Sequence, residues 1–473
     1  MSLRLPSKRR PAVTNQVEIL DASANLQRLP QVSQPTMKGF APYVKHLEGL
    51  AEAIARKGAR DTTWHKLLGG ALDGQPAARL RELVPLHVRK DAGAFFTGTA
   101  LAKLALGGQA PAFSETSVIF DPACGVGDLL VACARNLPTK PDLLSTLSRW
   151  GNQLHGRDLH VEFIRAAKAR LLLLGLSMGL SLGKRTLPPL DELLPNISVG
   201  DGLKDLSVAK AVSDILINPP FQKVQLPSDC PWGSGRMSLA AIFMDRCLST
   251  ATPGTRITAI LPDVLRSGVT YSRWRSWVEA RARVESIKVH GVFDSWADVD
   301  VFILKLVVGG SAAQGLSWNA NRQFHGSTIR DYFELHVGTV VPHRHEERGS
   351  WHPYVTTRRL KPWIITNADN QPKRRYQGRT FKPPFVAVRR TSAPGDVDRA
   401  VGTLVRGRQP VAVENHLLVL LPKDGSFRQC RQLMAVLRDS RTKDWLDMRI
   451  RCRHLTVEAV SEMPWWDHAN SRS

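Results

Sequence analysis

Hydrophobic and polar positions divide the chain into stretches of different periodicity. Apolar residues recur at spacings of three and four over 45–59 and 74–88, which predicts helices. From 117 onward, short runs rich in β-branched residues alternate with helical patterns, of which 161–175 is the clearest. Strands that alternate with helices over about 200 residues predict a doubly wound α/β sheet.

The elements of this sheet and of the region after it can be placed along the chain. We expect strands at 117–121, 152–158, 197–201, 214–218, 255–262, 285–291 and 299–309, and further helices at 238–250 and 271–283. Small residues at 309–317 are typical of a linker. The expected regions are a flexible basic tail (1–36), a helical N-terminal region (37–110), the α/β domain (111–310) and a smaller α+β domain (318–473). The last has strands at 383–390 and 413–422 and helical stretches near 428–447.

Composition adds a charge and a compartment to this picture. The 473 residues include 65 Lys and Arg against 42 Asp and Glu, a net charge of +23 that favours a polyanionic partner such as nucleic acid. A merely basic soluble protein would show the same excess. No apolar run approaches the ~20 residues of a membrane span. The six cysteines stand singly with no CxxC pair, which favours a reduced, cytoplasmic protein without a zinc ribbon.

The first candidate for chemistry is the segment FDPACGVGDLL (120–130). A strand ends there and turns through two glycines into a helix, so backbone can approach a ligand closely and the new helix offers free N–H groups. The pattern is not GxGxxG and no Walker lysine follows, which disfavours dinucleotide and P-loop sites. The cofactor-binding residues expected in this turn are Asp121, Pro122, Ala123, Cys124, Gly125 and Gly127.

Two acidic residues end the next expected strands. Asp158 is placed to accept the two hydroxyls of a ribose, as acidic residues do in other nucleoside-binding α/β sheets. An aspartate that favours the start of a helix is the simpler alternative. Asp201, followed by Gly202, is suited to the amine of an adenine ring, and its alternative is an aspartate in a turn.

The decisive segment is Asn218-Pro219-Pro220-Phe221, at the end of the strand expected over 214–218. Ligands bind at the carboxyl ends of strands in doubly wound sheets, so this position favours a role in binding. The alternative is a proline-rich turn with a surface aromatic and no functional role. The amine of a nucleobase is a poor nucleophile because its lone pair is delocalised. The Asn218 side-chain oxygen and the Pro219 carbonyl can hold its two hydrogens, and Phe221 can stack on the planar group. These four residues are therefore the expected catalytic residues.

DPACGVGDLL, RD, GDGL and NPPF, in this order, resemble the motifs of S-adenosylmethionine-dependent DNA adenine methyltransferases of the gamma type, found in type I and type II restriction-modification systems. The resemblance covers about 90–310. It implies a Rossmann-like methyltransferase sheet, S-adenosyl-L-methionine as cofactor, and direct methylation of the exocyclic amine of a flipped adenine. GAFFTG (93–98) resembles the motif that precedes the glycine turn, which adds Phe96 and Thr97 as cofactor-binding residues. Gly98 replaces the family's proline.

The C-terminal region resembles the target-recognition domains of these enzymes, which implies double-stranded DNA as a partner. Arg449, Arg451 and Arg453 alternate along MRIRCRHL, so an extended chain would place all three on one face. Arg389 and Arg390 add to a surface suited to phosphates. His343, His345 and His352 lack a nearby Cys or carboxylate cluster, and we expect no metal site.

Other functions share these motifs. The same Asn-Pro-Pro-aromatic segment occurs in methyltransferases of guanine amines in ribosomal RNA and of a release-factor glutamine, and methylation of the cytosine amine is also open. A non-catalytic DNA-binding subunit that keeps the fold is a different class of function, which the Gly98 departure mildly favours. The resemblance also implies a bacterial cytosolic protein in a restriction-modification or related defence system, with a separate nuclease or specificity subunit as a further candidate partner.

Overall fold

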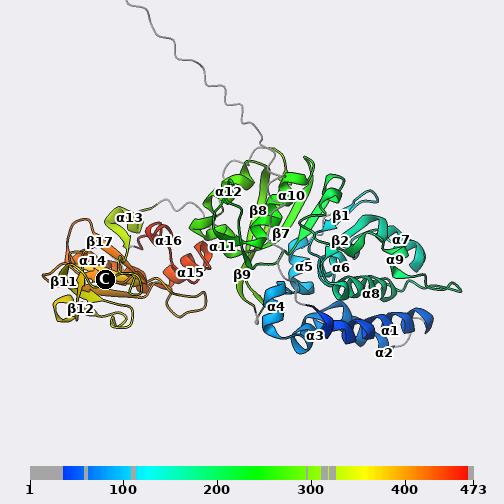
Figure 1. Ribbon diagram of the computed structural model, residues 1–473, viewed down its shortest axis with the longest axis horizontal. Coiled ribbons are helices and arrows are strands. Elements are labelled where there is room, and N and C mark those ends of the chain that lie inside the picture. The colour runs from blue at the N-terminus through cyan, green and yellow to red at the C-terminus, as the bar shows by residue number, and fades with distance from the viewer. Residues whose placement is uncertain are drawn as a thin grey trace, which may run out of the picture.

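The computed structural model describes residues 36–57, 62–107, 113–294, 297–310, 318 and 326–466. The expected tail therefore lies almost entirely outside the described residues. Figure 1 shows a larger domain on the right, with the N-terminal helices below it, and a smaller domain on the left. The N-terminal helices are η2 (Lys38–Phe40), α1 (Ala41–Lys57), α2 (Thr62–Leu72), α3 (Gln75–Leu83), α4 (Leu86–Ala92) and α5 (Gly98–Leu106).

A seven-stranded sheet forms the centre of the larger domain. Its strand order is β3-β2-β1-β4-β7-β9-β8, in which the first five strands are parallel and β9 runs antiparallel to both of its neighbours. The strands are β1 (Ile119–Asp121), β2 (Leu154–Asp158), β3 (Ile197–Val199), β4 (Asp214–Ile217), β7 (Arg256–Pro262), β8 (Ala282–Asp294) and β9 (Ala297–Val308). This topology confirms the predicted doubly wound, Rossmann-like sheet. The order reverses between β1 and β4, which is where such sheets bind ligands.

Helices cover both faces of this sheet, as a parallel sheet requires. Side chains from α1, α5, α6, α7 and α8 share one hydrophobic core, and side chains from α10, α11 and α12 share the other. The remaining elements of the domain are α6 (Asp128–Ala134), α7 (Leu143–Gln153), α8 (Val161–Ser177), α9 (Leu190–Leu193), η3 (Ser207–Lys210), β5 (Lys223–Gln225), β6 (Arg236–Ser238), α10 (Leu239–Thr250), α11 (Asp263–Ser267), η4 (Val269–Tyr271) and α12 (Ser272–Glu279).

The smaller domain is an α+β unit. A five-stranded sheet of order β10-β17-β14-β15-β12 carries helices on one face and a three-stranded sheet of order β13-β11-β16 on the other. Its elements are α13 (Ile329–Tyr332), β10 (Phe333–Val337), β11 (Ser350–Val355), β12 (Ile365–Asn367), η5 (Ala368–Asn370), β13 (Lys373–Tyr376), β14 (Phe385–Arg389), β15 (Gly402–Arg406), β16 (Ala412–Val413), β17 (Leu417–Pro422), α14 (Phe427–Arg438), α15 (Ser440–Arg449) and α16 (Val457–Ser461).

Several expected boundaries differ from those observed: the strand expected over 197–201 ends at Val199, and the one expected over 413–422 is split into β16 and β17. The helix expected over 271–283 ends at Glu279, and the chain is already in β8 from Ala282. The helical stretches expected near 428–447 are the two helices α14 and α15, and Asp439 caps the second by accepting the Arg441 backbone N–H at 2.9 Å.

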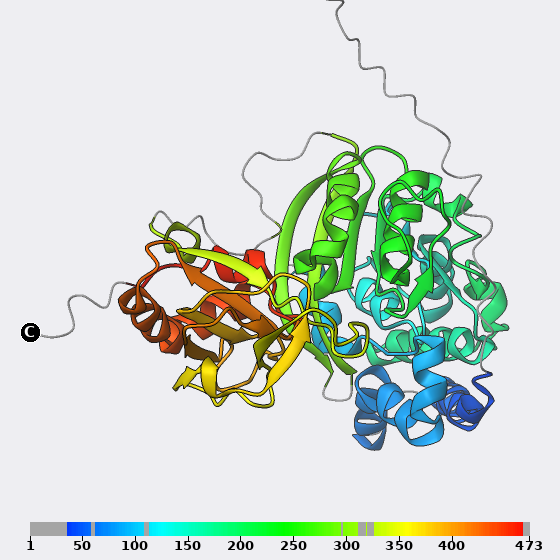
Figure 2. The same cartoon turned by 60° about the vertical axis from the view of Figure 1, so that its left-hand side comes forward.

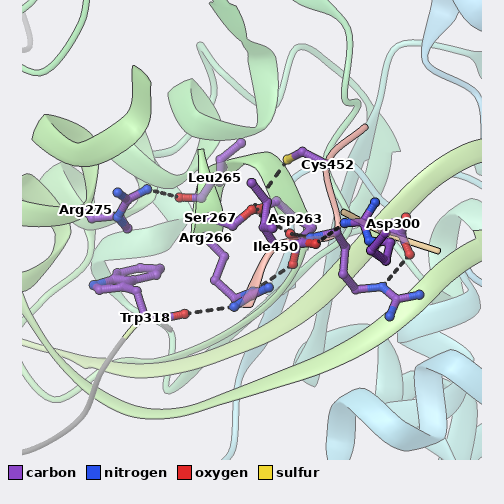
Figure 3. Close-up of polar contacts among 11 residues, drawn as sticks. Asp263, Leu265, Arg266, Ser267, Arg275, Asp300, Trp318, Ile450 and Cys452 are labelled. Carbon is purple, nitrogen blue, oxygen red and sulfur yellow. Dashed lines mark hydrogen bonds and ion pairs between the residues drawn. The ribbon is translucent and has the colours of Figure 1, made fainter. Parts of the chain in front are cut away.

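The two domains meet where the chain leaves α15. Figure 2 shows the red C-terminal helices against the green strands of the larger domain, and Figure 3 shows the polar contacts there. The Arg451 guanidinium pairs with Asp300 of β9 at 2.6 Å, and the Arg451 backbone N–H donates to Asp263 of α11 at 3.1 Å. Asp263 is buried, pairs with Arg266 at 2.7 Å and accepts the Ser267 hydroxyl at 2.7 Å. An ion-paired junction therefore joins the domains beside the carboxyl end of β7.

Candidate functional site at the carboxyl edge of the sheet

The glycine turn after β1 needs residues without side chains. Gly125 and Gly127 adopt φ values of +51° and +80°, which favour glycine. A Cβ on Gly127 would lie 2.9 Å from the Cβ of Ala167, so α6 and α8 pack closely at this point. Phe96 lies over Gly125 and contacts Phe163 edge to face, with ring centroids 5.1 Å apart. The segment that carries Phe96 therefore contacts the glycine turn.

Asp121, the last residue of β1, stabilises the start of this turn. Its carboxylate accepts the Ala123 N–H at 3.0 Å and is 1 % exposed. Burial raises the pKa of Asp121 to about 8, with the neighbouring charges of Asp158 and Asp128 acting in the same direction. Burial also raises the pKa of the Cys124 thiol well above its usual value, so this cysteine is no thiolate nucleophile near neutral pH.

Asp158 lies beside the glycine turn, at the end of β2. One carboxylate oxygen accepts the Gly125 N–H at 3.0 Å, and the other accepts the His160 N–H at 2.9 Å. Burial raises the pKa of Asp158, and these two N–H donors oppose the shift. Each oxygen keeps a further lone pair, so the carboxylate can hold the turn and still accept a hydroxyl. Its ribose role stays a prediction.

The loop after β3 packs directly on the loop after β1. A Cβ on Gly202 would lie 1.8 Å from the Pro122 carbonyl oxygen, so only glycine fits there. Asp201 accepts the Leu203 N–H at 3.0 Å, as in an aspartate turn, and its other oxygen lies 3.4 Å from the Lys204 ammonium. The turn alternative therefore describes Asp201 in this structure, and its adenine role stays a prediction.

Asn218 follows β4 and meets Thr97, 121 residues earlier. Its side-chain N–H donates to the Thr97 hydroxyl oxygen at 3.0 Å. The other end of the amide, Oδ1, is buried and accepts no hydrogen bond from any described residue. A buried acceptor without a donor costs about 1–3 kcal/mol, which a bound donor would recover. The site thus holds one carbonyl oxygen ready for an N–H group.

Gly98 has a structural reason to replace proline. It adopts φ +69° and donates its N–H to Asp128 at 2.8 Å. Proline has no N–H and is confined to φ near −65°, so it could make neither feature. This difference from the motif that the segment resembles is therefore part of how this chain positions Thr97.

Arg170 holds Asp128 from α8. The two side chains pair at 2.8 Å and are both at least nine-tenths buried. The guanidinium also donates to the carbonyls of Ala71, Leu72 and Val126 at 2.9, 3.2 and 2.7 Å. One buried cation therefore ties the end of α2 to the glycine turn and, through Asp128, to the loop that carries Thr97.

Phe221 and its neighbours form the other side of the Asn218 loop. Phe221 contacts Phe293 of β8 edge to face, with centroids 5.8 Å apart. Pro220 packs tightly against Gly93, because a Cβ added to Gly93 would lie only 2.3 Å from the Cβ of Pro220. The Gln222 side-chain oxygen is buried and accepts no hydrogen bond from a described residue.

Four residues at the site were absent from the sequence prediction: Asp128, Arg170, Gln222 and Phe293. Two of them carried a signal in the sequence. Asp128 stands within the glycine-turn motif, and Arg170 interrupts the apolar face of its helix. Phe293 could not be paired with Phe221 from spacing, because the register of two distant segments decides that contact.

The predicted arginine face is wrong. α15 continues to Arg449, which is 3 % exposed and pairs with Glu462 at 2.9 Å, while Arg451 pairs with Asp300 across the domain junction. Arg453 is exposed, and its carbonyl accepts the Ser392 N–H. The three residues are therefore not on one extended face.

Arg389 and Arg390 are half-buried. Their guanidinium groups donate to the carbonyls of Leu360 and Asn415 at 3.1 and 3.2 Å. Both arginines thus make contacts within the domain, and a phosphate role for them stays a prediction.

The described part of the chain holds no group of three or more His, Cys, Asp or Glu side chains that could bind a metal ion. His352 contacts the Pro410 carbonyl instead, at 3.2 Å. Within the same residues, no helix is both long and apolar enough to cross a membrane.

Several solved structures are similar to parts of this chain. The type IIL restriction-modification enzyme MmeI, solved with DNA, matches 81 % of this chain and 70 % of its own at 12 % identity and a TM-score of 0.49. The type IIG restriction endonuclease BpuSI matches 93 % and 72 % at 12 % identity and a TM-score of 0.43. A modification subunit assigned to a type I restriction enzyme of Vibrio vulnificus YJ016 matches 50 % of each chain at 17 % identity and a TM-score of 0.36.

The matched proteins belong to restriction-modification systems, and this chain spans half the length of the Vibrio subunit. At identities of 12–17 % the likeness concerns the fold alone. No family model and no curated protein matches the sequence.

Proposed function

We propose that this chain is a DNA methyltransferase that modifies the exocyclic amine of a flipped adenine with S-adenosyl-L-methionine. The observation that carries the proposal is the buried Asn218 oxygen without a donor among the described residues, at the carboxyl end of β4 and next to Thr97. An amine brings the N–H that this oxygen lacks. A non-catalytic subunit would have no need to keep such a costly acceptor.

Thr97 and Asn218 act together on the amine. Because the Thr97 hydroxyl accepts the Asn218 N–H, it fixes the amide with its oxygen toward the target. The Asn218 oxygen and the Pro219 carbonyl then accept the two amine hydrogens, which draws the nitrogen lone pair out of conjugation with the ring. Phe221 lies close by in the chain and offers its ring face for stacking. The amine nitrogen would form its new bond directly to the methyl carbon as the carbon–sulfur bond of the sulfonium breaks, and the displaced amine proton would pass to water.

The residues around the glycine turn fit the cofactor by their chemistry. Asp158 and Asp201 supply carboxylate oxygens for hydroxyl and amine groups, and the tight packing of Gly202 on Pro122 brings the two loops together. Phe96 and Thr97 border the turn from the other side. When bound, S-adenosylmethionine supplies an electrophilic methyl group. The chain's part is to bind it and to orient the amine.

DNA as the substrate rests on charge and on the second domain. A net charge of +23 favours a polyanion, and flipping a base from a duplex costs a few kcal/mol that protein–phosphate contacts must offset. The motif order with the α+β domain last favours DNA over RNA or a protein amide. A role in a restriction-modification or related defence system, with a nuclease or specificity subunit as partner, belongs to the same proposal.

The test is methyl transfer by the purified chain. Labelled S-adenosylmethionine is offered with unmethylated genomic DNA, ribosomal RNA or protein extract as acceptor. We expect label in adenine of the DNA alone and its loss in Asn218→Ala, with cofactor affinity unchanged within about threefold. Label in RNA or protein, or full transfer by the variant, would contradict the proposal.

A further inference from the structure

One surface of the C-terminal domain has no part in the contacts described above. Strands β11 and β13 form an antiparallel pair, here called the basic ribbon, with Trp351 opposite Arg375 and Pro353 opposite Lys373. Residues directly opposite on paired strands lie on one face of a sheet. Trp351, Arg375 and Lys373 therefore share a face.

The exposure of Trp351 is unusual for so large an apolar side chain. Its relative exposed area is 59 %, whereas Trp150, Trp232 and Trp274 are each at most 1 % exposed. Lysine and arginine on an edge strand such as β13 protect it from pairing with other chains. That protection explains Lys373 and Arg375 but gives no reason for an exposed tryptophan beside them. Exposed aromatic side chains among polar ones are typical of binding surfaces.

The charge around the ribbon is mostly positive, although Glu347, just before β11, pairs with Arg374 of β13 at 3.4 Å. Between 358 and 382 the chain carries eight Lys and Arg and a single acidic residue, Asp369. Asp369 is occupied, because its carboxylate accepts the Arg408 backbone N–H at 3.0 Å. A surface of this kind is complementary to a polyanion.

The ribbon is held rigidly. Arg375 donates to the Gly349 carbonyl at 3.1 Å, which fixes its stem, and Arg374 on the opposite face donates to the His345 carbonyl at 2.6 Å. β11 also pairs with β16, and Val355 at its end is buried in the core between the two sheets of the domain. A site on a strand supported in this way loses little entropy on binding.

The geometry points to the basic ribbon as the element that enters the major groove of duplex DNA. The major groove admits a two-stranded β-ribbon. Lys373 and Arg375 bind phosphates, and Trp351 makes apolar contact with base edges such as the thymine methyl group. This inference rests on the proposed function, because it names the surface by which that enzyme binds its DNA.

The charge part is tested with matched double variants of the full chain. Lys373→Ala/Arg375→Ala removes two ribbon cations, and Lys423→Ala/Arg428→Ala removes two exposed cations on the helical face of the domain. The affinity for a duplex of about three helical turns is measured by fluorescence anisotropy between about 50 and 200 mM salt. Two lost phosphate contacts should reduce the slope of log affinity against log salt by about 1.8. The control variant should keep the wild-type slope.

The aromatic part is tested with Trp351→Ala against Val397→Ala, an 87 % exposed residue in a loop that contacts α15. An apolar base contact should cost about tenfold in affinity with the salt slope unchanged. Both tryptophan and cation variants should keep the wild-type melting temperature, since the replaced side chains are exposed.

Failures of the two proposals are distinguishable. If the wild-type chain methylates DNA but the ribbon variants bind like the wild type, the ribbon inference alone is overturned. Equal losses in both double variants would overturn it as well, because charge in general would then explain binding. If the wild type neither binds nor methylates duplex DNA, the proposed function fails and the ribbon inference with it.

Discussion

At the scale of single residues, the site depends on the orientation of one amide. The Thr97 hydroxyl accepts a hydrogen bond from the Asn218 side-chain N–H. The Asn218 side-chain oxygen is then buried without a donor among the described residues. Without Thr97, the Asn218 side-chain amide could rotate and present its NH₂ group to the site in place of its oxygen. The departure at Gly98 belongs to the same feature, since it sets the backbone that carries Thr97.

Thr97→Val should lower kcat by about tenfold, because the Asn218 amide loses the partner that orients it and about 1–1.5 kcal/mol of stabilisation is lost. Thr97→Ser keeps the hydroxyl and should retain most of the activity. Cofactor affinity is measured alongside by titration calorimetry. A valine variant with wild-type kcat would mean that the amide is held by other contacts.

Gly98→Pro should destabilise the protein by about 3 kcal/mol, because proline cannot adopt φ +69° or donate to Asp128. Gly98→Ala keeps the N–H and meets no atom within 4 Å, so only backbone strain of about 1–2 kcal/mol remains. Urea unfolding of the two variants gives both values. If the proline variant, which restores the family motif, were as stable as the wild type, the assigned role of the Gly98 N–H would be wrong.

Asp121 should make stability fall as pH rises. Its pKa is about 8 in the folded chain and near 3.8 in the unfolded one, so between these values the folded state binds the extra proton. Folding stability then decreases with pH, by at most ~1.4 kcal/mol per pH unit. Asp121→Asn should flatten this dependence between pH 5 and 8 in urea unfolding. An identical slope in wild type and variant would refute the raised pKa.

At the scale of elements, a buried ion pair joins segments that the chain keeps far apart. Arg170 on α8 reaches the end of α2, the glycine turn and the start of α6. The helical region before the sheet is thereby fastened to the loops that would bind the cofactor. Burying such a pair of charges is costly. Replacing only one of the two residues therefore leaves the other charge buried without a partner.

Arg170→Met should cost about 3–5 kcal/mol of stability, because Asp128 is left buried and unpaired. The double variant Arg170→Met/Asp128→Asn removes both charges and should recover part of that loss. A double-mutant cycle by urea unfolding measures the coupling. Additive losses in the double variant would show that the two side chains act independently.

The ends of the strands at the site could be predicted from the sequence, whereas the contacts between distant segments could not. Every motif at the site follows a strand or begins a helix, and these patterns are local: DILI is buried at all four positions and Asn218 comes directly after it. The meeting of Thr97 with Asn218, and of Phe221 with Phe293, depends on packing between distant segments. Alternating arginines at 449–453 misled because helix α15, favoured by its Asp439 cap, extends to Arg449.

At the scale of the whole molecule, an ion pair joins the two domains in addition to the covalent connection between them. Arg451 pairs with Asp300, and its backbone N–H donates to Asp263, so the segment after α15 is fixed on the larger domain. Under the proposed function, a flipped base has to reach Asn218, which requires the C-terminal domain at a defined place. We infer that this junction sets the relative position of the two domains.

Arg451→Ala should therefore reduce kcat/KM for DNA by about tenfold while leaving cofactor affinity unchanged. Asp300→Asn should give the same loss, because it breaks the same ion pair without touching DNA. Steady-state kinetics and small-angle scattering of both variants test this. A loss confined to Arg451→Ala, together with a shallower salt dependence, would instead assign Arg451 to a phosphate.

The central claim is tested most directly by expressing the chain in a bacterial host that lacks DNA methylation and digesting its genomic DNA to nucleosides. Mass spectrometry should find N6-methyladenine with the wild-type chain and none with Asn218→Ala expressed to the same level. A genome without methylated adenine, or with methylated cytosine in its place, would contradict the adenine methyltransferase. Equal methylation by the variant would contradict the role of the Asn218 oxygen.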